Sequence, residues 1–149
     1  MKQDFAVTVA RVEGAWQVRP FEDDFTNVRT SVNAVRNLRS EGAAFALLCV
    51  DNDYFVIVRP TPTRVQFLLS DATAAAEDDF AADILDELDV DIPDADEEPY
   101  AEGDFDILAD LGVSEQVMQV ITDEIDWWAS EQLLRIAEEL GFEDELADL

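Results

Sequence analysis

The sequence predicts an α+β fold, in which an antiparallel five-stranded sheet with two helices is followed by an acidic linker and a small C-terminal helical segment. Apolar residues alternate with others, or fill short runs, in five segments, which indicates strands. Between and after these runs the apolar spacing changes to three and four residues, which indicates helices. The order of the first elements is ββαβββα, which favours an antiparallel sheet with both helices on one face.

The first two strands form a predicted hairpin. Residues 4–12 alternate between the two faces, Glu13-Gly14 provides a tight turn, and residues 16–18 continue as a shorter strand that ends at Pro20. A helix is expected over residues 24–40, because its apolar residues make one stripe: Phe25, Val28, Val32 and Val35. We expect its N-terminal cap to be Asp23 or Asp24 and its exit to lie at Gly42.

Three further strands are predicted at residues 45–50, 54–59 and 64–70, with turns at 51–53 and 60–62 between them. The first two of these strands are apolar on both faces, which is typical of strands in the middle of a sheet that is covered on both sides. The C-terminal segment or a second copy of the protein could supply the second cover. A helix capped by Ser70-Asp71 is expected to run to Leu88 and to bury one stripe: Ala76, Phe80, Ile84 and Leu88.

An acidic linker follows, because residues 86–103 contain nine acidic residues, no base and two prolines, Pro93 and Pro99. No glycine stands where an EF-hand loop requires one, so the linker predicts no calcium site. Beyond it we expect helices at 105–111, from Ser114 to Ile125, and from a cap at Ser130 to Gly141. The predicted organisation is a sheet domain, a linker and an acidic helical segment: residues 1–88, 89–103 and 104–149.

Composition excludes the common catalytic sites that depend on histidine or on several cysteines. The chain has no histidine and one cysteine, so common zinc sites and Ser–His–Asp or Cys–His pairs cannot form, and we predict no catalytic residue, metal or cofactor. Cys49 lies in an apolar strand, where a small buried hydrophobe is expected. No apolar run reaches the roughly 18–20 residues needed to span a bilayer, and the first residues lack a secretory pattern. A cytoplasmic location is therefore expected.

Acidic residues are distributed unevenly along the chain. Residues 65–149 contain 28 of the 36 acidic residues and a single base, Arg135, whereas residues 1–64 are formally neutral. So acidic a surface repels nucleic acid and anionic lipid and attracts basic proteins. We therefore expect a basic protein partner, no direct contact with nucleic acid and none with membranes.

Candidate partner-binding residues lie in the acidic half: Trp127, Trp128, Glu138 and Glu139. Adjacent tryptophans on a helix point about 100° apart, so both rarely share one core. Either both are covered within the protein, or one belongs to a protein interface, where tryptophan is enriched. Glu138 and Glu139 are either solvated helix surface or contacts for a basic partner.

The chain resembles a known family in several segments that occur in a fixed order: Phe5–Trp16, Asp53–Arg59, Leu69–Ala76, Asp106–Gly112 and Ile136–Gly141. Together with the acidic spacer, they are similar to the tRNA adenosine deaminase-associated protein family of actinobacteria over nearly the full chain. The resemblance implies a cytoplasmic protein associated with the deaminase that converts adenosine to inosine in tRNA. The element order is also analogous, at the level of fold alone, to roadblock-like modules, many of which dimerise.

Three functional hypotheses follow. The first is a non-enzymatic adaptor that binds the basic surface of tRNA adenosine deaminase through its acidic C-terminal half. The alternative is a homodimeric structural or regulatory module of roadblock-like type, unrelated to tRNA, which the two-sided apolar strands motivate. The third is an enzyme that works with carboxylates alone.

Overall fold

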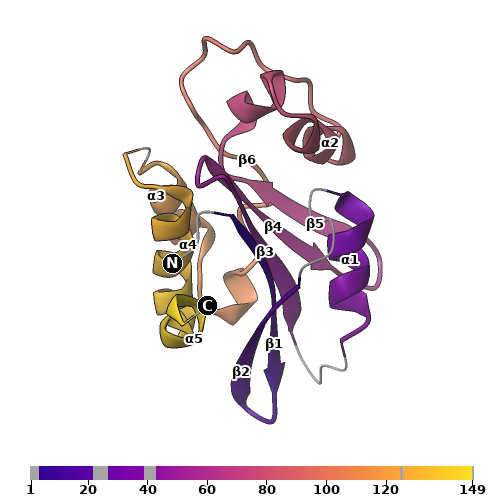
Figure 1. Ribbon diagram of the computed structural model, residues 1–149, viewed down its shortest axis with the longest axis vertical. Helices are drawn as coiled ribbons and strands as arrows, with labels where there is room; N and C mark the ends of the chain where they lie inside the picture. Colours follow the sequence, from indigo (N-terminus) through magenta and orange to yellow (C-terminus); the bar gives the residue numbers. More distant parts are fainter. Residues whose placement is uncertain (1–3, 22–26, 39–42, 125, 149) are drawn as a thin grey trace.

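The computed structural model describes residues 4–21, 27–38, 43–124 and 126–148, and it confirms the predicted α+β class with an antiparallel sheet. The strands are ordered β2-β1-β3-β4-β5-β6 and every neighbouring pair is antiparallel (Figure 1). Their bounds are Phe5–Val12 (β1), Ala15–Pro20 (β2), Ala44–Val50 (β3), Tyr54–Pro60 (β4), Val65–Leu69 (β5) and Glu102–Gly103 (β6).

The sheet has six strands, so the prediction of five was wrong. The additional strand, β6, pairs its Gly103 with Leu68 of β5. Two residues are too few to produce a visible alternation in the sequence. Gly103 has a φ of +132°, and a Cβ at this position would collide with the carbonyl oxygen of Phe67. Glycine is therefore required where the acidic segment joins the sheet.

Five α-helices and two short 3₁₀ helices complete the described part of the chain: α1 (Val28–Arg36), η1 (Ala72–Ala76), α2 (Asp79–Glu87), η2 (Ala109–Leu111), α3 (Glu115–Thr122), α4 (Ala129–Leu140) and α5 (Glu143–Ala147). The start of α1 is capped by Asn27, whose side chain accepts a hydrogen bond from the backbone of Arg29. The predicted caps Asp23 and Asp24 and the predicted exit Gly42 lie outside the described residues.

The single helix expected from Ser70-Asp71 to Leu88 is divided into η1 and α2. Asp78 explains the break, because one carboxylate oxygen accepts from the backbone N–H of Phe80 and caps α2, at 2.9 Å. Its other oxygen accepts from the hydroxyl of Tyr54, at 3.0 Å. Burial and the neighbouring Asp78 carboxylate raise the pKa of Tyr54, which keeps this donor protonated.

On the C-terminal side the predicted cap of α3 at Ser114 and the predicted end of α4 at Gly141 are confirmed, but other helix boundaries differ. Residues 105–111 form turns and η2 instead of an α-helix. Their local bonds span three residues, as from Ile107 N–H to the Asp104 carbonyl oxygen, and the Ile107 carbonyl oxygen accepts from Arg59 of β4. The helix expected to start at Ser130 begins at Ala129 instead. Its first N–H groups are bonded by Asn52 in the β3–β4 turn.

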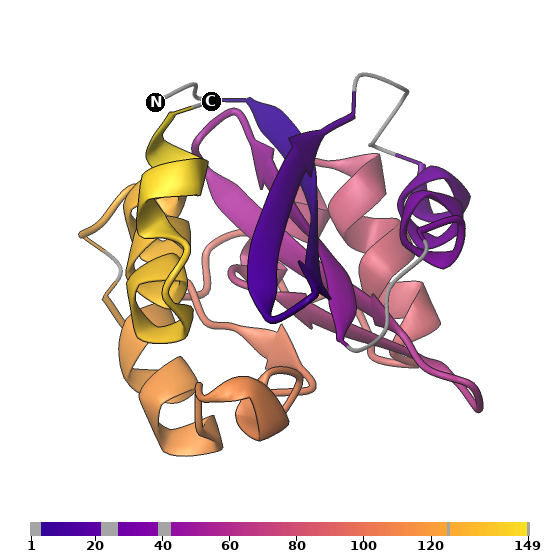
Figure 2. The ribbon, with the colours of Figure 1, turned by 90° about the horizontal axis from the view of Figure 1, so that it is seen from below.

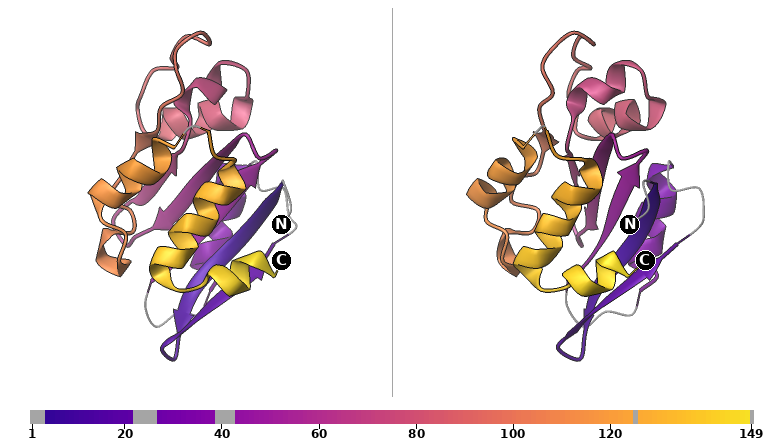
Figure 3. Two further views of the ribbon diagram at one scale, coloured as in Figure 1. Left: turned by 90° about the vertical axis from the view of Figure 1, so that its left-hand side faces the viewer. Right: turned by 60° about the vertical axis from the view of Figure 1, so that its left-hand side comes forward.

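The sheet is sandwiched between two helical layers (Figure 2). One face packs against α1, η1 and α2, so the prediction that the first two helical segments share a face is confirmed. The other face packs against residues of the C-terminal segment, including α3, α4 and α5, which lie in front of the sheet in Figure 3. The C-terminal segment is therefore the cover that the two-sided apolar strands require.

An aromatic cluster holds the end of α4 to the sheet. Trp16 of β2 donates from Nε1 to the carbonyl oxygen of Leu140, at 2.9 Å. The Trp16 ring lies 5.5 Å from the ring of Phe142, measured between centroids, and 6.2 Å from that of Phe45. Phe45 and Phe142 are completely buried, so this contact is part of the core beneath the C-terminal helices.

A second tie joins β4 to the segment before α3. Arg59 donates to both carboxylate oxygens of Asp110, at 2.6 and 2.9 Å, and to the carbonyl oxygen of Ile107, at 2.7 Å. The Arg59 side chain is 14% exposed and that of Asp110 is 63% exposed. The hydrogen bond from Arg59 lowers the pKa of Asp110 below its usual value.

Replacing Asp110 by asparagine is expected to reduce the free energy of unfolding at pH 7 by up to about 1 kcal/mol, because the pair is bidentate but solvent-screened. A lowered folded-state pKa stabilises the protein above the carboxyl pKa of the unfolded chain, and this stabilisation disappears as the pH falls through the folded-state value. Urea unfolding at pH 7 and about pH 2–3 measures the difference. Asp106→Asn, which changes an exposed neighbour, controls for the general relief of negative charge. An equal loss at both pH values would contradict the ion pair.

The helices in the described residues are all too short or too polar to cross a bilayer. The division into segments at 1–88, 89–103 and 104–149 stays a prediction, which a truncation tests below.

Candidate protein interface

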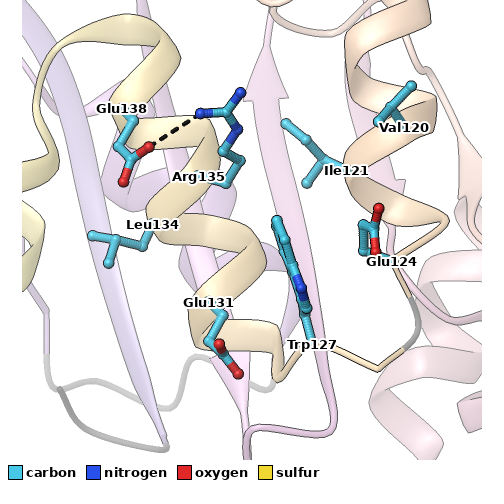
Figure 4. Close-up of a pocket in the computed structure, with 8 residues that line it drawn as sticks. All are labelled: Val120, Ile121, Glu124, Trp127, Glu131, Leu134, Arg135 and Glu138. Carbon is cyan, nitrogen blue, oxygen red and sulfur yellow. Dashed lines mark hydrogen bonds and ion pairs between the residues drawn. The ribbon is translucent and has the colours of Figure 1, made fainter.

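A groove of about 490 Å³ lies on the surface between α3 and α4 (Figure 4). Residues of both helices and of the turn between them line it: Val120, Ile121, Glu124, Trp127, Glu131, Leu134, Arg135 and Glu138. The lining combines apolar side chains with three carboxylates and one guanidinium. A concave surface of this composition can bind an apolar side chain that carries positive charges beside it.

The wall formed by α3 follows from its amphipathic sequence. Ser114 caps the helix by accepting from the backbone of Val117, as predicted. Met118 and Ile121 point into the core that covers the sheet. Val120 lies off this stripe and is 62% exposed, so an apolar side chain stands at the edge of the groove with no cover from the described residues.

The wall formed by α4 is fixed by contacts of its first two turns with other elements. Asn52 caps the start of the helix, with its side-chain oxygen 2.8 Å from the backbone nitrogen of Ser130. The buried side chain of Gln132 donates from Nε2 to the carbonyl oxygens of Ile121 and Glu124, at 3.1 and 3.4 Å. Because Gln132 bonds the end of α3 directly, the separation of the two walls is set by a buried hydrogen bond.

The two tryptophans lie in the turn between the helices, so the 100° separation of adjacent residues on a helix does not apply to them. Trp127 is 39% exposed and stands between α3 and α4 in Figure 4. Trp128 precedes α4, is 60% exposed and does not line the groove. Neither ring is fully covered within the described structure.

Arg135 forms ion pairs with both of the predicted glutamates. Its Nη1 lies 3.2 Å from Glu138 and its Nη2 lies 2.9 Å from Glu139. All three side chains are between 30% and 49% exposed. Glu138 lines the groove with Arg135, whereas Glu139 does not.

The groove therefore unites two of the four predicted residues, Trp127 and Glu138. The others lie close by in sequence but outside the lining. Sequence reasoning missed the other six lining residues: Val120, Ile121, Glu124, Glu131, Leu134 and Arg135. One signal was present, because Val120 is a large apolar residue that falls beside the stripe of its own helix.

The described residues contain no group of three or more His, Cys, Asp or Glu side chains placed to hold a metal ion. Cys49 is buried, as predicted. Burial raises its pKa to about 12, so the thiol stays protonated and unreactive near neutral pH.

Comparison with known proteins gives two matches. Residues 4–143 match the model of a family described as Rv3753c-like tRNA adenosine deaminase-associated protein. Protein Rv3753c of Mycobacterium tuberculosis is 49% identical over 147 residues, which cover 96% of this chain and 85% of that protein. No solved structure matches.

Proposed function

The chain belongs to the Rv3753c-like tRNA adenosine deaminase-associated protein family, and from this premise we propose that it is a non-enzymatic adaptor that binds tRNA adenosine deaminase. A zinc deaminase of nucleobases uses a His-x-Glu element and a Pro-Cys-x-x-Cys element. This sequence has no histidine and one cysteine. The adaptor would thus leave the chemistry to its partner.

The distribution of charge is the observation that carries this proposal. The arginines of α1 lie in the layer on the far side of the sheet from α3, α4 and α5 (Figure 2). The C-terminal layer has one base, Arg135, and that base is paired with two of its own glutamates. An acidic layer with so little positive charge favours a basic protein surface.

A tRNA-modifying enzyme has such a surface, because it must bind a phosphate backbone. Docking of the acidic layer there would place carboxylates where tRNA phosphates bind. The adaptor would then compete with tRNA for the deaminase. The homodimer alternative was motivated by the two-sided apolar strands, and the cover that these strands require is supplied within the chain, so that motivation no longer distinguishes it.

We expect the purified chain and the deaminase of the same organism to co-elute at low salt. The complex should weaken at physiological salt, where charges more than about 8 Å apart are largely screened. Size-exclusion chromatography with light scattering measures both conditions, and added tRNA should release the adaptor. If no complex forms at micromolar concentrations at low salt or at physiological salt, the proposal is contradicted.

A further inference from the structure

We propose that the α3–α4 groove receives an amphipathic helix of the partner, with apolar side chains against Val120 and Trp127 and Lys or Arg side chains on its flanks. Arg135 acts there as an intramolecular competitor for the partner's cations. This inference rests on the proposed function for the identity of the partner, although not for the chemistry of the groove.

The groove suits a helix better than an extended peptide. A strand needs an exposed sheet edge to bond its backbone, whereas a helix bonds its own and needs only a shaped apolar surface. Both walls here are helices. The floor is Ile121, which is 3% exposed, and the exposed edge residues Val120 and Trp127 add apolar area.

The carboxylates of the groove determine which residues should stand beside the apolar stripe of the partner helix. Glu124 lies at the α3 side of the groove, and Glu131 and Glu138 lie along α4. Three carboxylates around one apolar surface are complementary to a helix whose apolar stripe has basic residues beside it. A neutral or acidic helix would leave these carboxylates desolvated without partners.

Arg135 occupies the place of one such basic residue. In Figure 4 its side chain lies on the side of α4 that faces α3, and its guanidinium is paired with Glu138. Exposed ion pairs of this kind contribute little to folding. Their larger effect falls on binding, because a partner cation must displace Arg135 and is repelled by it.

Isothermal titration calorimetry with two ligands tests the inference: the deaminase, and a synthetic amphipathic helix of about 15 residues with a leucine stripe and lysine flanks. Val120→Gln and Trp127→Ala should each weaken binding of both ligands, by about 3-fold and at least about 10-fold respectively. Arg135→Gln should tighten binding about 3-fold, since it removes a like charge and frees two carboxylates. A peptide of the same composition in scrambled order should bind more weakly than the amphipathic one.

Two matched variants distinguish binding in the groove from a general attraction of the acidic protein for a basic ligand. Glu124→Gln should weaken binding of both ligands, whereas Asp83→Asn, which removes an exposed carboxylate from α2, should leave the affinity within about 2-fold. Val120 is exposed, so its variant keeps the test valid if Trp127→Ala misfolds.

The two proposals fail in different ways. If the deaminase binds and neither Val120→Gln nor Glu124→Gln changes its affinity, the groove is overturned and the adaptor function stands. If the deaminase does not bind while the amphipathic peptide does, with the expected pattern of variants, the partner is wrong and the groove stands. Equal binding of the scrambled peptide overturns the helical occupant, and weaker binding by Arg135→Gln overturns the competitor role.

Discussion

Replacing Phe142 by alanine is expected to lower the free energy of unfolding by about 3–5 kcal/mol, the usual cost of truncating a buried phenylalanine. The ring is completely buried and packs against Trp16 and Phe45. Since the free energy of unfolding of a domain is only about 5–15 kcal/mol, this single change would remove a large part of it. Urea unfolding followed by circular dichroism measures it.

The cost should be this high because the site cannot collapse easily. Trp16 is held in place by its hydrogen bond to Leu140, so it is not free to move into the space that Phe142 leaves. Trp128→Ala is the matched control, because it removes a larger but 60% exposed ring and should change stability by no more than about 0.5 kcal/mol. A loss below about 1 kcal/mol for Phe142→Ala would show that the aromatic cluster does not anchor α4.

This anchor matters for the proposed interface. α4 forms one wall of the groove and is held at both ends, by Asn52 at its start and by the Trp16–Phe142 cluster at its end. A wall fixed in this way presents its carboxylates at defined positions before a partner arrives. Preorganisation of this kind reduces the entropic cost of association.

The strands were predictable because their signal is local. Alternation and two-sided apolar runs identified β1 to β5, and the implied second cover of the sheet is present as the C-terminal segment. The sixth strand has no local signal, since it consists of Glu102 and Gly103 alone. Its position is set by pairing with β5.

Helix boundaries were less predictable wherever distant residues decide them. Asn52 caps α4 from the β3–β4 turn, which displaces the expected Ser130 cap, and Arg59 bonds the segment that was expected to be helical at 105–111. The five-residue helix α5 was not predicted, because a helix of that length depends on packing rather than on its own periodicity.

In the candidate site, too, some features have a local sequence signal and others depend on tertiary contacts. Composition and the paired tryptophans pointed to the acidic half, and Trp127 does line a groove. The groove itself requires α3 and α4 to be placed side by side, which a buried bond from Gln132 achieves. A single sequence offers no signal for that contact.

Truncation of the chain after Gly103 is expected to abolish cooperative folding. The shortened chain would lack the cover over nine apolar residues of the sheet: Phe5, Val7, Val9, Phe45, Leu47, Cys49, Phe55, Ile57 and Leu68. Each buried side chain of this size contributes roughly 1.5–3 kcal/mol relative to exposure. Their combined loss exceeds the stability of a typical domain, so we expect aggregation or a broad, non-cooperative unfolding transition.

Adding residues 104–149 as a separate fragment should restore a cooperative transition, because it supplies the missing layer without a covalent link. A reversible, cooperative transition of the truncated chain alone would instead show that the predicted sheet domain is independent.

Dependence of the fold on the C-terminal segment has a consequence for partner binding. If the acidic segment is one layer of the core rather than an appendage, then the groove between α3 and α4 exists only while the whole domain is folded. A partner that binds this groove would therefore stabilise the entire protein, and the gain in its unfolding temperature would grow with partner concentration.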